Sequence, residues 1–248
     1  MERTDDAVGT GREARLVATF VELADTLVED FDVVELLYTL TERVVEMSIA
    51  SEAGILLADE AGDLQFVAAS EERTHLLELF QVQNQEGPCQ DCFMTGRPVG
   101  IADLENAQER WPLFAPKALS LGFRSVQAVP LRLRGDILGA LNLFRNEPGG
   151  IGDEDQLVVQ AMGDVATIGL LQHREARWAA TVTDQLQHAL HSRISIEQAK
   201  GVISEQSGFS MDASFALLRA HSRRHNRKLS DLARAVVDHE IDARGLSG

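Results

Sequence analysis

Five basic side chains lie close together near the C-terminal end of the sequence, within RAHSRRHNRK at residues 219–228. A guanidinium group donates paired hydrogen bonds to phosphate and stacks on unpaired bases, so such a cluster suits RNA loops. The alternative is a solvated charge run, because the helix dipole stabilises cations near a helix C-terminus. That alternative explains one or two of the cations more readily than all five. The five are Arg219, Arg223, Arg224, Arg227 and Lys228.

Cys89 and Cys92 form a second chemically suggestive group, in EGPCQDCFMTG at residues 86–96. On a turn or at a helix start the pair could be a redox-active dithiol, and a helix N-terminus would lower the pKa of a thiol. Structural zinc needs four ligands, so a metal would require histidines such as His75 or a second subunit. The third interpretation is ordinary thiols or pocket lining. A lone C-x-x-C is a weak signal, so all three stay open, and we predict neither a metal nor a catalytic residue.

Aromatic side chains close to these cysteines are candidates for the lining of a small-molecule pocket, and they could equally be core residues. They are Phe93, Trp111 and Phe114. No motif identifies a ligand or cofactor, so the expectation is limited to an unidentified small molecule.

Charge is spread unevenly along the 248 residues, whose formal net charge is −16. Residues 180–248 hold nine Lys and Arg and eight Asp and Glu, a net of +1, so the remaining 14 basic and 31 acidic side chains give residues 1–179 a net charge of −17. This asymmetry predicts two domains with different partners. An acidic N-terminal part is a poor nucleic-acid binder, and an anion site in the near-neutral C-terminal part must be a local patch.

Composition and the N-terminal residues favour a cytoplasmic protein. Hydrophobic residues make up 44% of the chain, and no apolar run approaches the ~18–20 residues that span a bilayer. The first residues, MERTDDAVGTGREAR, contain no apolar stretch of the kind that a secretory signal needs. Two cysteines suit a reducing compartment.

The hydrophobic periodicity of the first 170 residues predicts an α+β domain with a largely antiparallel sheet and flanking helices. The clearest signal is a hairpin at 125–146, where two β-rich runs flank Gly135. Residues 1–12 are polar and are expected to be disordered. The other expected elements are helices at 13–48, 72–83 and 110–123, strands at 53–59, 64–70 and 97–104, and a long helix from 153.

The long helix is expected to run from Asp153 to about Ser207 and to link the two domains. Part of it fits a heptad seam, which favours a parallel dimer coil and therefore a homodimer. In the alternative, its first half packs on its own sheet. The seam residues are Val158, Ala161, Val165, Ile168, Ala179, Val182, Leu186 and Ala189.

The last 60 residues predict a small all-α unit of three helices. Gly208 is expected just past the end of the first helix, in a left-handed conformation. Ser210 and Ser230 are expected to cap the second and third helices. On the second helix, Arg219, Arg223 and Arg227 would form one stripe at 100° per residue.

One set of residues lies at specific spacings across 192–237: Arg193, Ile196, Glu197, Ala199, Lys200, Gly201, Gly208, Ala213, Phe215, Leu218, Arg219, Leu229 and Ala233. In this set the segment resembles an ANTAR domain, the three-helix RNA-binding module of bacterial transcription antiterminators.

The resemblance implies binding of paired hairpin loops in a nascent mRNA. Ala199 and Gly201 would then let RNA or a partner helix come close, although a tight helix crossing explains them too. Arg193 would contact RNA or brace the fold. The cations implied to contact phosphates and bases are Lys200, Arg219, Arg223, Arg224, Arg227 and Lys228.

The N-terminal part resembles a GAF domain, mainly in the hairpin VPLRLRGDILGALNLFR at 129–145 and in GRPVGIADL at 96–104. GAF joined to ANTAR is a familiar arrangement in actinobacterial regulators and implies a sensor that controls an RNA-binding output. The expected domains are a disordered 1–12, a GAF sensor domain at 13–170, a helical linker or coiled coil at 171–184, and an ANTAR domain at 185–245.

Two other functions stay open at this point. Some GAF domains reduce free methionine sulfoxide with cysteines, so Cys89 and Cys92 allow a thiol redox enzyme or sensor. The helical C-terminal unit could alternatively be a DNA-binding helix-turn-helix.

Overall fold

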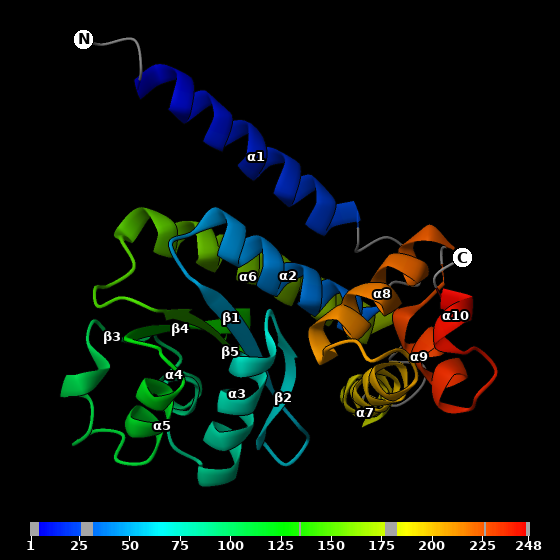
Figure 1. Cartoon of the computed structure of the whole chain (residues 1–248). Coiled ribbons are helices and arrows are strands. Elements are labelled where there is room, and N and C mark those ends of the chain that lie inside the picture. The colour runs from blue at the N-terminus through cyan, green and yellow to red at the C-terminus, as the bar shows by residue number, and fades with distance from the viewer. Residues whose placement is uncertain (1–4, 26–31, 134, 177–182, 226, 247–248) are drawn as a thin grey trace.

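The computed structural model describes residues 5–25, 32–133, 135–176, 183–225 and 227–246, and the side chains of all of these except 5–10, 172–192 and 243–244. Two units lie side by side (Figure 1). The first, here called the sheet unit, is a five-stranded sheet covered by helices on both faces. The second, the helical unit, is a group of helices beyond strand β2 at the edge of the sheet.

The sheet is antiparallel throughout, with the strand order β2-β1-β5-β4-β3. Strands β4 and β5 form the predicted hairpin, in which Leu133 pairs with Asp136. Gly139 of β5 must be a glycine, because a Cβ there would lie 2.1 Å from the backbone oxygen of Leu56 on β1. The strands are β1 (Glu52–Ala58), β2 (Leu64–Ala69), β3 (Val99–Ile101), β4 (Ser125–Leu133) and β5 (Asp136–Arg145).

Three helices cover the first face of the sheet, with α1 lying outermost over α2 and α6 (Figure 1). Helix α2 begins where it does because the Asp32 carboxylate accepts hydrogen bonds from the amides of Val34 and Glu35, at 2.9 and 3.4 Å. Its apolar residues join one buried cluster with the sheet and with the core of the helical unit. The helices are α1 (Asp5–Asp25), α2 (Val33–Met47) and α6 (Asp153–Ala176).

Helix α6 packs on its own sheet through Val159, Met162 and Ala166, each of which is fully buried. The first residues of the predicted heptad seam are half-buried or exposed: Val158, Ala161, Val165 and Ile168. The rest of the seam falls on positions or side chains outside the described residues, as does most of the expected 171–184 linker. The dimer coil therefore stays a prediction.

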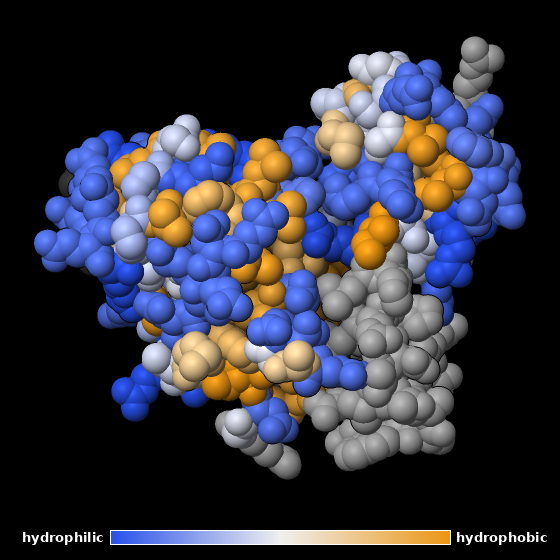
Figure 2. Space-filling model, turned by 90° about the horizontal axis from the view of Figure 1, so that it is seen from below, coloured by the Kyte–Doolittle hydropathy of each residue, from blue (hydrophilic) through white to orange (hydrophobic). Residues whose placement is uncertain are grey.

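Three helices and a short 3₁₀ turn cover the second face of the sheet and enclose a separate buried cluster. Helix α5 begins at Phe114, where the Glu86 carboxylate accepts hydrogen bonds from the amides of Leu113 and Phe114 at 2.7 and 2.8 Å. Seen from below, the surface is largely hydrophilic, with apolar residues gathered near its middle (Figure 2). The elements are α3 (Glu72–Asn84), α4 (Pro88–Thr95), η1 (Leu104–Asn106) and α5 (Phe114–Ser120).

The helical unit consists of α7 (Thr183–Ser207), α8 (Met211–Arg224), α9 (Leu229–Val237) and α10 (Ala243–Leu246). Gly208 follows α7 with a φ of 74°, the left-handed conformation that was expected there. The Ser210 hydroxyl accepts a hydrogen bond from the Ala213 amide at 3.2 Å, so the predicted cap of α8 is confirmed. None of the described helices is both long and apolar enough to cross a lipid bilayer.

The predicted α+β class, hairpin and C-terminal helices are confirmed, and four local predictions are wrong. Residues 5–12 are helical rather than disordered. Strand β3 is shorter than expected, since only Val99–Ile101 pair with β4. Helix α5 is shorter as well, because turns precede Phe114 and Gly122 follows the helix with a φ of 89°. Helix α9 begins at Leu229, so Ser230 lies inside it and is not its N-cap. A short fourth helix, α10, extends the unit beyond the three that were expected.

Candidate nucleic-acid interface

The basic side chains of α8 face acidic side chains of α2. Glu35, Thr39 and Glu42 follow one another at four- and three-residue steps, so they share one stripe of α2. Arg219 and Arg223 are four residues apart and share one stripe of α8. Because the two helices meet along these stripes, the contact pairs opposite charges from segments about 180 residues apart in sequence.

Arg219 is the most enclosed of these cations, with 7% of its surface exposed. Its Nη2 lies 3.2 Å from Oε1 of Glu35 and 3.4 Å from the Thr39 hydroxyl. A second ion pair joins Nη1 to Glu42. Three acceptors thus surround one guanidinium, which leaves it little capacity for another anion.

Arg223 makes a more open contact one turn further along α8. Its Nη2 lies 2.9 Å from Oε1 of Glu35, the same oxygen that Arg219 contacts, and its side chain is 48% exposed. The Glu35 carboxylate therefore bridges two arginines. This contact forms the rim of the interface, whereas Arg219 occupies its interior.

Lys200 of α7 makes a parallel set of contacts with α3. Its ammonium nitrogen lies 3.2 Å from Oε2 of Glu72 and 3.1 Å from Oε2 of Glu197, and the residue is 5% exposed. Burial alone would raise the pKa of Glu72, but Lys200 and His75 together hold it below its ordinary value. The lysine is therefore a charged bridge between the two units.

Arg193 reaches from α7 to the exposed edge of the sheet at β2. Its Nη1 donates a 2.8 Å hydrogen bond to the backbone oxygen of Phe66, and its guanidinium lies 3.5 Å from the centroid of the Phe66 ring. Burial lowers the pKa of Arg193 to about 10. Of the two roles expected for this residue, the contacts favour bracing, here between the two units.

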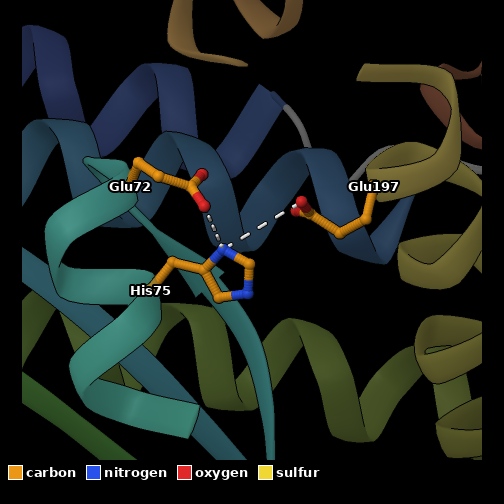
Figure 3. A group of neighbouring side chains, drawn as sticks. All are labelled: Glu72, His75 and Glu197. Atoms are coloured by element: carbon orange, nitrogen blue, oxygen red, sulfur yellow. Dashed lines mark ion pairs between the residues drawn. The ribbon is translucent and has the colours of Figure 1, made fainter. Parts of the chain in front are cut away.

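His75 of α3 lies in the middle of these contacts. Its Nε2 is 2.7 Å from Nη2 of Arg193. Arginine has no acceptor, so Nε2 accepts this hydrogen bond and the ring proton must sit on Nδ1. Burial is the main cause of a lowered pKa for His75, which agrees with a neutral ring. Figure 3 shows Nδ1 directed between the carboxylates of Glu72 and Glu197, at 3.3 and 4.0 Å.

Three potential ligand atoms, from Glu72, His75 and Glu197, lie within 4.8 Å of one another (Figure 3). Such a set could hold a divalent cation. Lys200 already brings a positive charge within 3.2 Å of both carboxylates, and Arg193 adds a second cation at the other ring nitrogen. A metal ion would have to displace that lysine, so the arrangement fits an ionic contact between the two units.

Two further contacts join the units without cations. The rings of Tyr38 on α2 and Phe215 on α8 lie 4.4 Å apart at their centroids. The Asp32 carboxylate caps α2 with one oxygen, and with the other it accepts hydrogen bonds from the Ser230 amide and hydroxyl at 3.2 and 3.0 Å. A single aspartate therefore caps one helix in each unit.

The chain matches two family models, and their boundaries follow the two units. Residues 32–170 match the GAF domain, and residues 184–237 match the ANTAR domain. The first match covers more than half of the chain. The chain belongs to the GAF domain family. An ANTAR domain follows the GAF domain, and this composition is that of a sensor-regulator rather than an enzyme.

Solved GAF domains share the fold at low sequence identity. The GAF domain of an Acinetobacter phosphoenolpyruvate-protein phosphotransferase is 14% identical over 64% of this chain and 94% of its own, with a TM-score of 0.50. That of a Coxiella burnetii phosphoenolpyruvate-protein phosphotransferase is 15% identical over 66% and 96%, also at 0.50. A free methionine-R-sulfoxide reductase from Neisseria meningitidis is 17% identical over 66% and 92%, at 0.49. No curated protein matches the chain.

The remaining predicted RNA-binding residues of the ANTAR domain differ in exposure. Arg224 and Arg227 are exposed, and Lys228 is half-buried. Helix α8 ends at Arg224, so Arg227 lies beyond it and does not continue the stripe of Arg219 and Arg223 as expected. Ala199 is fully buried in the domain core, which leaves no room for RNA at that position, whereas Gly201 is exposed.

The two cysteines lie in the buried cluster on the second face of the GAF domain. Cys89 and Cys92 are unbridged and 0% exposed. Helix α4 begins at Pro88, so the predicted position at a helix start is confirmed. Burial nevertheless raises the pKa of both thiols, that of Cys92 to about 12. Desolvation outweighs the helix dipole here, so both sulfurs stay protonated near neutral pH.

The expected aromatic pocket does not form as one site. Trp111 and Phe114 are at most 1% exposed and belong to the core. Phe93 instead lines a surface hollow of about 520 Å³ between the β1–β2 turn, α3 and α4, beside Met94 and Asp91. Of the three aromatic residues predicted to line a pocket, Phe93 alone borders a space that a small molecule could enter.

A buried carboxyl group lies on the same face, and the sequence pattern did not single it out. Glu78 of α3 is fully buried and accepts hydrogen bonds from the side-chain amides of Asn142 and Gln81, at 2.8 and 2.7 Å. Burial raises its pKa to about 7, although these two hydrogen bonds lower it. The acidic stripe on α2 was missed as well, although the spacing of Asp32, Glu35 and Glu42 could have shown it.

Proposed function

We propose that this protein is a transcription antitermination regulator whose ANTAR domain binds hairpin loops of nascent mRNA. A signal sensed by the GAF domain controls that binding. The observation that carries the proposal is the ANTAR match over residues 184–237, which contains the cation cluster of α8 and the loop after it. Because the proposed regulator acts on nascent transcripts, we propose that it is located in the cytoplasm of a bacterium.

The chemistry of the cluster supports RNA as the partner. Arg224 and Arg227 are exposed at the end of α8, and Arg219 and Arg223 extend the charge along that helix. Planar guanidinium groups suit phosphates and unstacked loop bases alike, whereas a duplex reader places a helix in the major groove. Within an acidic protein, this local patch provides the attraction for an anionic chain.

The test is binding of the full chain to an RNA with two linked hairpins. The double substitution Arg224→Ala and Arg227→Ala should weaken binding and reduce the slope of log affinity against log salt by about two. The matched control is Arg97→Ala, which removes an exposed arginine from the GAF domain and should leave affinity unchanged. Tighter binding to duplex DNA than to the hairpin RNA in competition would refute the RNA assignment.

We also propose a homodimer, since two hairpin loops call for two RNA-binding faces. The half-buried Val158 and Val165 and the 38% exposed Ile168 on α6 support it, because they leave an apolar edge beside the sheet contact. Light scattering of the full chain tests this proposal. A Val165→Glu substitution should convert a dimer to a monomer, and a monomeric wild type under all conditions would contradict it.

A further inference from the structure

Carboxylates of the GAF domain hold ANTAR cations that the proposed function and the ANTAR resemblance assign to RNA. Glu35 and Glu42 contact Arg219, Glu35 also contacts Arg223, and Glu72 contacts Lys200. We propose that this conformation is autoinhibited: the GAF domain occupies part of the RNA-binding face and must separate from it before RNA can bind. The inference rests on the proposed function and concerns the regulation of that site.

The carboxylates fill the positions that phosphate groups would need. A carboxylate and a phosphate both accept paired hydrogen bonds from a guanidinium in the same plane. Arg219 is 7% exposed and Lys200 is 5% exposed, so a nucleic acid cannot approach either one while the domains are docked. RNA and the acidic stripe of α2 are therefore competitors for one surface.

The docked arrangement is a specific interface, because apolar and capping contacts accompany the ion pairs. Tyr38 packs against Phe215, and Asp32 fixes the start of α9 beside the start of α2. The buried apolar cluster on the first face of the sheet continues into the ANTAR core. These contacts set one orientation between the domains and place Glu35 opposite Arg219.

One contact opposes docking. Glu71, just before α3, and Asp212, in the first turn of α8, line one small pocket between the two domains. Burial, followed by the negative charge of Asp212 and a hydrogen bond with it, raises the pKa of Glu71. Two acids in contact repel each other at neutral pH. The interface thus combines attraction between α2 and α8 with repulsion at Glu71, and this repulsion makes the closed state less favourable than the ion pairs alone would.

Two cations of the ANTAR domain are solvent-exposed in the closed state, Arg224 at the end of α8 and Arg227 just beyond it. Their positive charge can attract RNA to the domain, but Arg219 and Lys200 contribute only after opening. The apparent RNA affinity is then the affinity of the open state multiplied by the fraction of molecules that are open. A change that opens the interface should raise that affinity without adding any new contact.

The experiment measures the affinity of the full chain for the two-hairpin RNA in three glutamate variants. Glu35→Gln with Glu42→Gln removes the carboxylates that hold Arg219 and should raise the affinity about tenfold or more. Glu60→Gln with Glu109→Gln makes the same change in net charge at exposed sites away from the interface and should raise it less than about twofold. Glu71→Gln removes the repulsion and should lower it by about two- to fivefold.

Hydrogen exchange of α2 and α8 without RNA provides a second readout. Exchange should become faster in the Glu35 and Glu42 variant, stay unchanged in the control pair, and become slower in Glu71→Gln. Circular dichroism tests whether each variant is folded. If the double variant is not folded, the single variant Glu42→Gln replaces it in both measurements.

The outcomes separate the two proposals. Faster exchange with higher RNA affinity supports autoinhibition. Faster exchange without RNA binding in any variant overturns the proposed function and leaves the domain docking intact. Equal RNA affinity in the wild type and the opened variant overturns autoinhibition and leaves RNA binding intact. Higher affinity without faster exchange also overturns autoinhibition, because the gain would not come from opening.

Discussion

The core on the second face of the GAF sheet and the interface between the two domains bury ionisable groups in opposite ways. On the second face, Glu78, Cys89 and Cys92 keep their protons, because burial raises the pKa of each. At the domain interface, Arg219 and Lys200 are buried almost as deeply, but each lies within hydrogen-bond distance of carboxylates. One region removes charge from its core, and the other pairs charges across a boundary.

This difference separates a permanent core from an interface that can open. A protonated, neutral group in an apolar core favours no partial opening, because hydrating it adds little free energy before the whole domain unfolds. Paired charges at a boundary regain water when the partners separate, so much of the lost attraction is compensated by hydration. On the autoinhibition proposal, the interface is therefore the region where a signal would act, whereas the core on the second face stays closed until the domain unfolds.

The thiols should show the largest effect. With a pKa of about 12 for Cys92 against an ordinary 9.0, its thiolate fraction at pH 8 falls about 10³-fold. Alkylation of both cysteines by iodoacetamide should be slower in the native protein than in urea by at least that factor. A Met94→Cys variant, at a position 78% exposed on the same helix, should react at the rate of a free thiol. Rapid native alkylation of Cys89 or Cys92 would restore the redox-switch interpretation.

Glu78 should make stability depend on pH. Its pKa of about 7 in the folded protein exceeds the ordinary 4.5, so the folded state binds the proton more tightly. The resulting stabilisation is complete below about pH 4.5 and is lost as the pH rises to about 7, by roughly 3 kcal/mol.

Urea unfolding of the wild type and of Glu78→Gln, at several values between pH 4.5 and 7.5, measures this dependence. The difference between the two free energies of unfolding should change by roughly 3 kcal/mol across that range. His75 has a lowered pKa and therefore opposes the trend, because its contribution is lost as the pH falls, but it is present in both proteins and cancels. Parallel pH profiles would show that Glu78 is already ionised in the folded state.

Arg219 tests the interface side of the comparison. Arg219→Ala leaves Glu35 without its buried partner, and we expect a loss of about 2 kcal/mol in the free energy of unfolding of the docked protein. The value lies below that of a fully buried pair because Glu42 is 38% exposed. Arg227→Ala, which removes an exposed arginine nearby, should change stability by less than about 0.5 kcal/mol. Equal effects of the two substitutions would contradict the docked geometry.

Local sequence patterns were sufficient for the fold of each domain. The hairpin at 125–146 and the cap at Ser210 depend on neighbouring residues, so periodicity and turn chemistry predicted them. Helix ends were less predictable, since α8 stops at Arg224 and leaves Arg227 outside its stripe. Ser230 is not a cap because α9 begins one residue before it, and Asp32, almost 200 residues earlier, accepts hydrogen bonds from the Ser230 amide and hydroxyl.

The site was predicted only in part, because its partners come from the other domain. The sequence identified Arg219, Arg223 and Lys200 as cations of one module. It could not show that Glu35 and Glu72 face them, since that depends on how the domains dock. The thiols show the same limit: the helix start was predictable, but the burial that reverses its effect on their pKa was not.

Gly201 should show the smallest effect and the sharpest contrast between closed and open states. A Cβ added there would meet no described atom within 4 Å, so Gly201→Ala should stabilise α7 by about 0.5–1 kcal/mol. If RNA or a partner helix approaches this exposed position after opening, the added methyl group should lower the RNA affinity of the Glu35→Gln and Glu42→Gln protein. The same substitution should change the affinity of the closed wild type much less, because there the closed population limits binding. An unchanged RNA affinity in the opened protein would mean that the RNA binds elsewhere on the domain. It would also contradict a role of Gly201 in admitting RNA or a partner helix.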